Sequence, residues 1–219
     1  MRIRRAVPLT LLVVTAVVAT PALAGAKLAP SKPLAWTDTA GDANAVNDQG
    51  LPVPVPGDNA GPAQWDAADI TGVTFARLDD GKKVLGLTVT MKLSGAPSQG
   101  QLYRVTGAAG ACSIFWFQYS WTAGGAGAPT LRHNCAPSGS PTGAVSDTVS
   151  IPVDGKAVGS SIVWTLLLKD LPAGVKLGSV IAPTLGEVRV IVGAAGTSGV
   201  TAPVIDQTPT QTSAYKIGQ

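Results

Sequence analysis

The clearest hydrophobic pattern in the chain lies in residues 69–93. In residues 84–93 apolar side chains recur at every second position, at Leu85, Leu87, Val89, Met91 and Leu93. A period of two is typical of a strand with one buried face. Residues 73–78 alternate in the same way, and Asp80 and Gly81 between the two segments favour a tight turn, because glycine adopts positive φ without strain. The pattern therefore predicts a β-hairpin.

Short apolar or alternating runs predict further strands at 101–105, 112–121, 130–135, 147–153, 161–169 and 187–192. Gly- and Pro-rich turns separate them, including one expected at 154–156, and Tyr215 is expected to dock the C-terminal tail. Residues 25–62 carry many prolines and little periodicity, which predicts a loop. Neither an amphipathic helix nor an internal repeat is evident. The pattern predicts an all-β fold, an antiparallel β-sandwich of jelly-roll or immunoglobulin-like type with about eight strands and one disulfide.

The predicted strand at 112–121 holds five of the eleven aromatic residues of the chain. Alternation places Phe115, Phe117, Tyr119 and Trp121 on one face, and Ile114 and Trp116 on the other. A strand that is apolar on both faces fits a central position, with one face in the core and the other covered by a loop, a partner or a ligand. Core burial is the favoured interpretation. The alternative is a sugar-binding row, with Trp116, Tyr119 and Trp121 as the candidate ligand-binding residues.

Residues 1–24 show the pattern of a secretory signal peptide. Arg2, Arg4 and Arg5 precede an apolar run, and Ala22-Leu23-Ala24 forms a small-residue cleavage site. The alternative, a membrane anchor, needs about 20 apolar residues, and Pro21 interrupts the run early. We therefore expect a secreted, extracellular protein with a flexible N-terminal segment at 25–35 and a single β-sandwich domain at 36–219. No second apolar segment of membrane length follows.

Cleavage of the signal changes the charge balance. Loss of its three arginines leaves 13 of the 16 basic residues against 13 acidic ones. A near-neutral chain lacks the basic face that nucleic acids or anionic membranes require, so we expect no nucleic-acid partner.

Cys112 and Cys135 are the two cysteines of the chain. In an exported protein they favour a disulfide, with the segment at 130–135 returning antiparallel beside the aromatic strand. Two buried thiols are the alternative. A zinc site has less support, because two cysteines and the single His133 supply too few ligands.

Aspartates are crowded in residues 36–69, which hold six of the thirteen acidic residues. Calcium accepts several carboxylate and carbonyl oxygens at once, so such crowding favours a Ca²⁺ site, for which Asp38, Asp42 and Asp69 are the candidate ligands. The spacing does not match an EF-hand. The alternative is that these aspartates form local Asx-turns and carry solvated loop charges.

Catalytic chemistry has little support in the sequence. A hydrolase needs paired carboxylates or a Ser/His/Asp set, and neither a nucleophile elbow nor a carboxylate motif is present. His133 is more readily explained as a surface residue or one with satisfied hydrogen bonds than as a general base. We expect a protein that is not an enzyme.

Three short motifs carry a resemblance to a known family. They are Asp38 and Asp42 in DTAGD, the sequence AADI at 67–70, and DQTP at 206–209 followed by Tyr215. Over residues 36–218 the chain resembles secreted β-sandwich modules of the DOMON-like and family 9 carbohydrate-binding type. The resemblance implies a jelly-roll-like sandwich with a structural calcium near Asp38 and Asp42. In the sugar-binding relatives it further implies a ligand held between tryptophans.

The expected function is therefore a secreted, non-catalytic binding module for carbohydrate or cell-wall glycan, stabilised by calcium. The alternative is an extracellular protein-interaction or structural protein with no small-molecule ligand. Under that alternative the aromatic strand meets a protein partner and calcium only orders the loop.

Overall fold

The computed structural model describes residues 28–41, 43, 66–122, 125–135, 148–182, 184–190 and 204–219. The predicted signal peptide at 1–24 lies outside the described residues, and so does Asp42 of the predicted calcium site.

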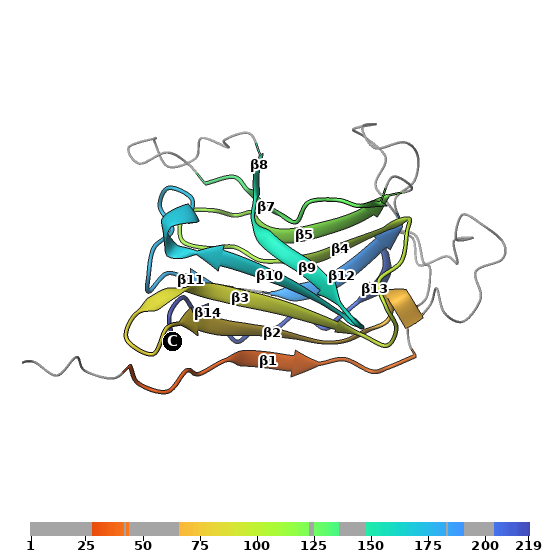
Figure 1. Ribbon diagram of the computed structural model, residues 1–219, viewed down its shortest axis with the longest axis horizontal. Coiled ribbons are helices and arrows are strands. Elements are labelled where there is room, and N and C mark those ends of the chain that lie inside the picture. The colour runs from red at the N-terminus through yellow and green to blue at the C-terminus, as the bar shows by residue number, and fades with distance from the viewer. Residues whose placement is uncertain are drawn as a thin grey trace, which may run out of the picture.

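The described residues form two antiparallel sheets, as the sequence predicts. Sheet A contains, in spatial order, β1 (Leu34–Thr37), β2 (Ile70–Asp79), β3 (Val84–Leu93), β10 (Ser161–Leu167) and β9 (Asp154–Val158). Sheet B contains β13 (Val204–Gln207), β12 (Leu185–Val190), β4 (Gln101–Thr106), β5 (Phe115–Thr122), β7 (Thr130–His133) and β8 (Val149–Pro152), with β6 (Gly125–Ala126) beside β5. Figure 1 shows β4, β5 and β7 above β1, β2 and β3. A small third sheet pairs β11 (Val180–Ile181) with β14 (Tyr215–Lys216), and the short 3₁₀ helix η1 (Leu168–Asp170) follows β10.

The predicted hairpin is confirmed as β2 and β3, which pair antiparallel with Phe75 opposite Val89. Gly81 in the turn has a φ of 81°, a conformation that strains residues with a side chain. Phe75, Leu87, Val89 and Met91 are all buried on the inner face, so the period-two pattern identifies the core face of both strands.

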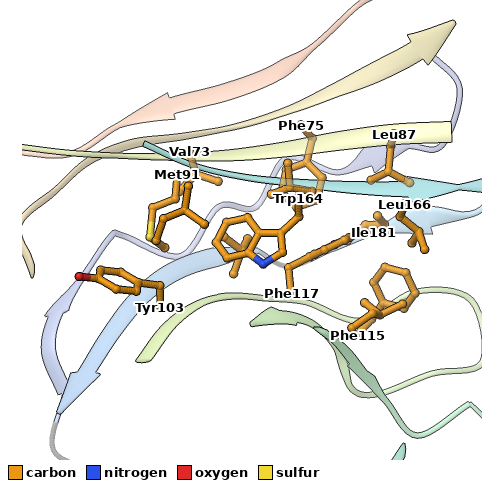
Figure 2. Close-up of a cluster of buried hydrophobic side chains, with 14 of the residues drawn as sticks. Val73, Phe75, Leu87, Met91, Tyr103, Phe115, Phe117, Trp164, Leu166 and Ile181 are labelled. Atoms are coloured by element: carbon orange, nitrogen blue, oxygen red, sulfur yellow. The ribbon is translucent and has the colours of Figure 1, made fainter. Parts of the chain in front are cut away.

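The core lies between the two sheets, where their inward side chains meet (Figure 2). Phe117 of sheet B packs against Phe75 and Trp164 of sheet A, with ring centroids 6.2 and 6.4 Å apart. The indole Nε1–H of Trp164 also donates to the backbone oxygen of Gln118 at 2.9 Å, across the two sheets. Burial of a large aromatic side chain stabilises the fold by about 2 kcal/mol, so each aromatic member of this cluster contributes to the free energy of unfolding.

The predicted disulfide between Cys112 and Cys135 is confirmed. It lies at one end of the antiparallel pair β5 and β7, in which Phe115 is opposite His133. In the chain-entropy model, a bond that closes a loop of this size stabilises the fold by about 3 kcal/mol.

Two sequence predictions differ from the structure. The described residues contain strands β1 to β14 rather than about eight, partly because β1 forms within residues expected to be a loop. The turn predicted at 154–156 is instead part of strand β9. Close packing requires glycine at position 155, because a Cβ there would lie 2.7 Å from the backbone oxygen of Val163. The chain turns later, at Gly159, which has a φ of 57°.

Residues 204–219 tie the two sheets together. The hydroxyl of Thr208 accepts hydrogen bonds from the indole of Trp36 on β1 and from the backbone N–H of Gly186 on β12, both at 3.0 Å. The ring of Tyr215 is buried 5.5 Å from that of Phe75, which confirms that it docks the tail. The side chain of Gln219 then donates to the backbone oxygen of Lys32, beside the start of β1.

Candidate functional site

The three residues predicted to bind a ligand lie on different faces of β5. Tyr119 is only 5% exposed and belongs to the core, and Trp121 packs partly buried against it, with ring centroids 6.3 Å apart. Trp116 occupies the opposite face, because successive side chains of a strand point to opposite sides. The structure therefore brings Tyr119 and Trp121 together inside and leaves Trp116 half-buried on the solvent side of sheet B.

A hollow of about 330 Å³ opens beside Trp116 on this outer face. We call it the outer hollow. Its lining includes Arg104 and Thr106 of β4, Trp116 of β5, Leu185 and Glu187 of β12, and Thr210 of the tail. Its volume lies at the small end of the range for ligand-binding pockets, which suits one or two sugar-sized units.

Arg104 and Glu187 form an ion pair within the lining of the outer hollow. The Nη1 of Arg104 lies 2.7 Å from Oε1 of Glu187, and the two side chains are 12% and 6% exposed. They face each other because the β4–β12 register places them directly opposite. When the side-chain amide of Gln118 is turned so that its oxygen faces Arg104, that oxygen accepts at 3.1 and 3.3 Å. Arg104 is thus held in one orientation, and its charge is neutralised locally.

The indole of Trp116 lies between two arginines. The guanidinium carbon of Arg104 is 4.6 Å from the ring centroid, and that of Arg132 is 5.8 Å away. Arg104 belongs to β4 and Arg132 to β7, and these strands flank β5 on opposite sides. A cation over an indole ring contributes about 1 kcal/mol, so the arginines also orient the ring.

A second hollow, of about 300 Å³, lies where β8 passes into β9 and near η1. Its lining includes Asp154, Lys169 and Asp170 but no aromatic side chain. Lys169 and Asp170 form an exposed ion pair with each other. The outer hollow is therefore the better candidate site, since it combines an aromatic wall with fixed polar groups.

The structure brings Asp38 and Asp69 of the predicted calcium site into one region. The backbone N–H of Asp38 donates to the oxygen of Thr71, and the N–H of Gly41 donates to Oδ2 of Asp69 at 2.8 Å. The hydroxyl of Ser94 donates to the same carboxylate. Asp69 is 2% exposed, and its Oδ1 is buried without a hydrogen-bond partner. An unsatisfied buried carboxylate oxygen is energetically costly, so something is expected to compensate it.

Asp206 of β13 is a neighbouring acidic residue that we did not select from the sequence. Its Oδ2 accepts from the backbone N–H of Ile70 at 2.6 Å, and Ile70 directly follows Asp69. Within the described ranges, however, no three acidic, histidine or cysteine side chains lie close enough to hold a metal together. Calcium binding stays a prediction.

His133 lies beside the disulfide and not in the outer hollow. Its Nδ1 accepts a long hydrogen bond, 3.4 Å, from the backbone N–H of Cys135, and partial burial lowers the pKa of the imidazole. These contacts match the expectation of a locally satisfied histidine.

Sequence reasoning missed Arg104, Glu187 and Arg132 as site residues. Their side chains occupy outward positions of strands, where charged residues are usual, so only the strand register shows that they converge on Trp116. Asp206 did carry a signal, because it is the first residue of the DQTP motif.

In the part of the chain that the structure describes, no helix has the length and apolar character needed to cross a membrane. Searches against protein-family models, curated proteins and solved structures found no match.

Proposed function

We propose that the protein is a secreted, non-catalytic module that binds carbohydrate in the outer hollow. The observation that carries the proposal is the position of Trp116, half-exposed beside the buried Arg104–Glu187 pair in a concave part of sheet B. The disulfide supports the extracellular setting, because such bonds persist in oxidising compartments.

The chemistry of the outer hollow suits a sugar. A pyranose has an apolar face that packs against an aromatic ring and a rim of hydroxyls that needs polar partners. Trp116 supplies the ring. Arg104 donates N–H groups, and Glu187 offers carboxylate oxygens that accept from sugar hydroxyls. The ion pair holds both side chains in place before a ligand arrives, which limits the entropy cost of binding.

The proposal is tested with glycan-array screening of residues 25–219, followed by calorimetric titration of the best binder. Trp116→Ala should weaken binding at least tenfold, about 1.4 kcal/mol, because it removes the ring without touching the core. Trp121→Ala is the matched control, since it makes the same change on the same strand but on the other face. The affinity of the Trp121→Ala variant should stay within a factor of three of the wild-type value.

Two results would contradict the proposal. Equal loss of affinity in both variants, with melting temperatures unchanged, would show that binding does not depend on the outer hollow. If neither variant nor wild type binds any saccharide, and Trp116→Ala instead abolishes capture of an extracellular protein, the interaction-protein alternative is correct.

We also propose that a calcium ion compensates the carboxylate of Asp69. Calcium accepts carboxylate and carbonyl oxygens, and the orphan Oδ1 of Asp69, with Asp38 nearby, fits that preference. The role is structural, because the backbone N–H of Gly41, in the turn at 38–41, donates to this carboxylate. The resemblance to DOMON-like and family 9 carbohydrate-binding modules implies a calcium ion in the same loop. That resemblance is itself part of the proposal.

Thermal unfolding, measured once in calcium and once in a chelator, tests this role. A ligand present at 100 times its dissociation constant stabilises the native state by about 2.7 kcal/mol. Asp69→Asn should abolish the calcium-dependent shift, whatever it does to the baseline melting temperature. Asp170→Asn, on the exposed η1, should leave the shift intact. A wild-type melting temperature that does not change when calcium is added would refute this role.

A further inference from the structure

Among the described side chains on the outer face of sheet B, Arg104 belongs to an ion pair and Arg132 does not. Arg104 is paired with Glu187 at 2.7 Å. Arg132 forms no ion pair with any residue of the described segments, although its guanidinium lies 5.8 Å from the same indole. The ion pair contributes no net charge, so Arg132 is left beside Trp116 with a positive charge that no described ion-pair partner balances.

The position of Arg132 connects it to the outer hollow. It lies directly opposite Trp116 in the β5–β7 ladder, and Ser150 is opposite it on β8. Residues opposite each other on one face of an antiparallel pair have Cβ atoms about 5 Å apart. A ligand that occupies the outer hollow and extends across the edge of Trp116 therefore reaches the guanidinium of Arg132.

We propose that Arg132 binds the carboxylate of an acidic saccharide, so that the module prefers uronic-acid-type glycans to neutral ones. A carboxylate matches a guanidinium in shape, because two parallel N–H groups donate to its two oxygens. It also matches in charge, since a single negative charge balances the positive charge of Arg132. A phosphate monoester carries about −1.5 to −2 and would leave negative charge unbalanced.

The half-buried position of Arg132 strengthens this interaction. Water screens an exposed ion pair to a value between about 0 and 1 kcal/mol. Arg132 is partly shielded by the indole and by neighbouring strands, where charge-assisted hydrogen bonds are roughly twice as strong as neutral ones. Arg104 cannot take this role, because its approach to a ligand carboxylate would bring that anion against Glu187.

The inference rests on the proposed carbohydrate function and is tested with matched probes. Trigalacturonate, the neutral galactose trimer and a sulfated galactose trimer are titrated into the mature protein at low and at physiological salt. The acidic trimer should bind at least tenfold more tightly than the neutral one at low salt, and the difference should shrink as salt rises.

Three variants assign the effect to residues. Arg132→Gln should abolish the preference for trigalacturonate while neutral binding persists, and Arg132→Lys should keep part of it. Lys92→Gln removes one positive charge from the exposed outer surface of sheet A and should change nothing. Unchanged melting temperatures exclude misfolding.

The outcomes separate this inference from the proposed function. Equal affinity for acidic and neutral trimers, with both lost in Trp116→Ala, would overturn the role of Arg132 and leave carbohydrate binding intact. Tighter binding of the sulfated trimer than of trigalacturonate would overturn the assignment to a carboxylate. Absence of binding to every trimer would overturn both.

Discussion

Thr208 offers a sharp test of how the tail holds the sheets together. Its side chain is 1% exposed, and its single oxygen accepts from Trp36 of sheet A and from Gly186 of sheet B. Thr208→Val keeps the shape but leaves both buried donors without a partner. Each such donor costs about 1 to 3 kcal/mol, so unfolding free energy should fall by about 3 kcal/mol.

Thr208→Ser is the matched control, because it keeps the hydroxyl and loses only one methyl, which is worth about 0.8 kcal/mol. Urea unfolding followed by tryptophan fluorescence measures both changes. In a Trp36→Phe background one donor is already gone, so Thr208→Val should cost about half as much. Equal losses for the Val and Ser variants would refute the two-donor geometry.

Other parts of the fold lead to further predictions. Gly86→Ala would drive a Cβ into the backbone oxygen of Leu166 and should cost about 3 kcal/mol, seen as a lower urea midpoint, while the outward Thr88→Ala on the same strand should cost less than about 1 kcal/mol. Reduction of the disulfide should lower the unfolding free energy by about 3 kcal/mol, measured by urea titration with and without reductant. Burial raises the pKa of Tyr103, so the folded state keeps this proton after the unfolded chain begins to lose it near pH 10. Stability should therefore fall as pH rises above about 10, and Tyr103→Phe should reduce that slope in melting curves recorded between pH 9 and 11. The remaining slope is expected from Tyr215, because burial also raises the pKa of its hydroxyl.

Local patterns were enough to predict the hairpin and the aromatic strand. The alternation at Val89 and Met91 and the glycine at 81 act within a few residues of each other, so sequence alone identifies the core face. Gly155 shows where this reasoning fails. In the sequence, a glycine required by a turn cannot be distinguished from a glycine required by close packing of a neighbouring strand. Only the position of Val163 in the structure shows that Gly155 is of the second kind.

The candidate site could be identified only once the pairing of the strands was known. Arg104 and Glu187 lie 83 residues apart, and Trp116 meets them only because β4 lies between β5 and β12. The face of Trp116 was predictable from alternation, whereas the convergence of charges around it was not, since register is a property of the assembled sheet.

The tail also determines when the fold is finished. A chain is synthesised from its N-terminus, so β1 and β2 can pair early, yet the acceptor for Trp36 and the ring that packs on Phe75 are made only when synthesis reaches residues 208 and 215. A copy shortened at residue 203 would lose both together with β13, leaving a sheet edge uncovered. Such a copy should unfold and be degraded rather than persist as a weakened version, so residues 204–219 are required for a stable fold.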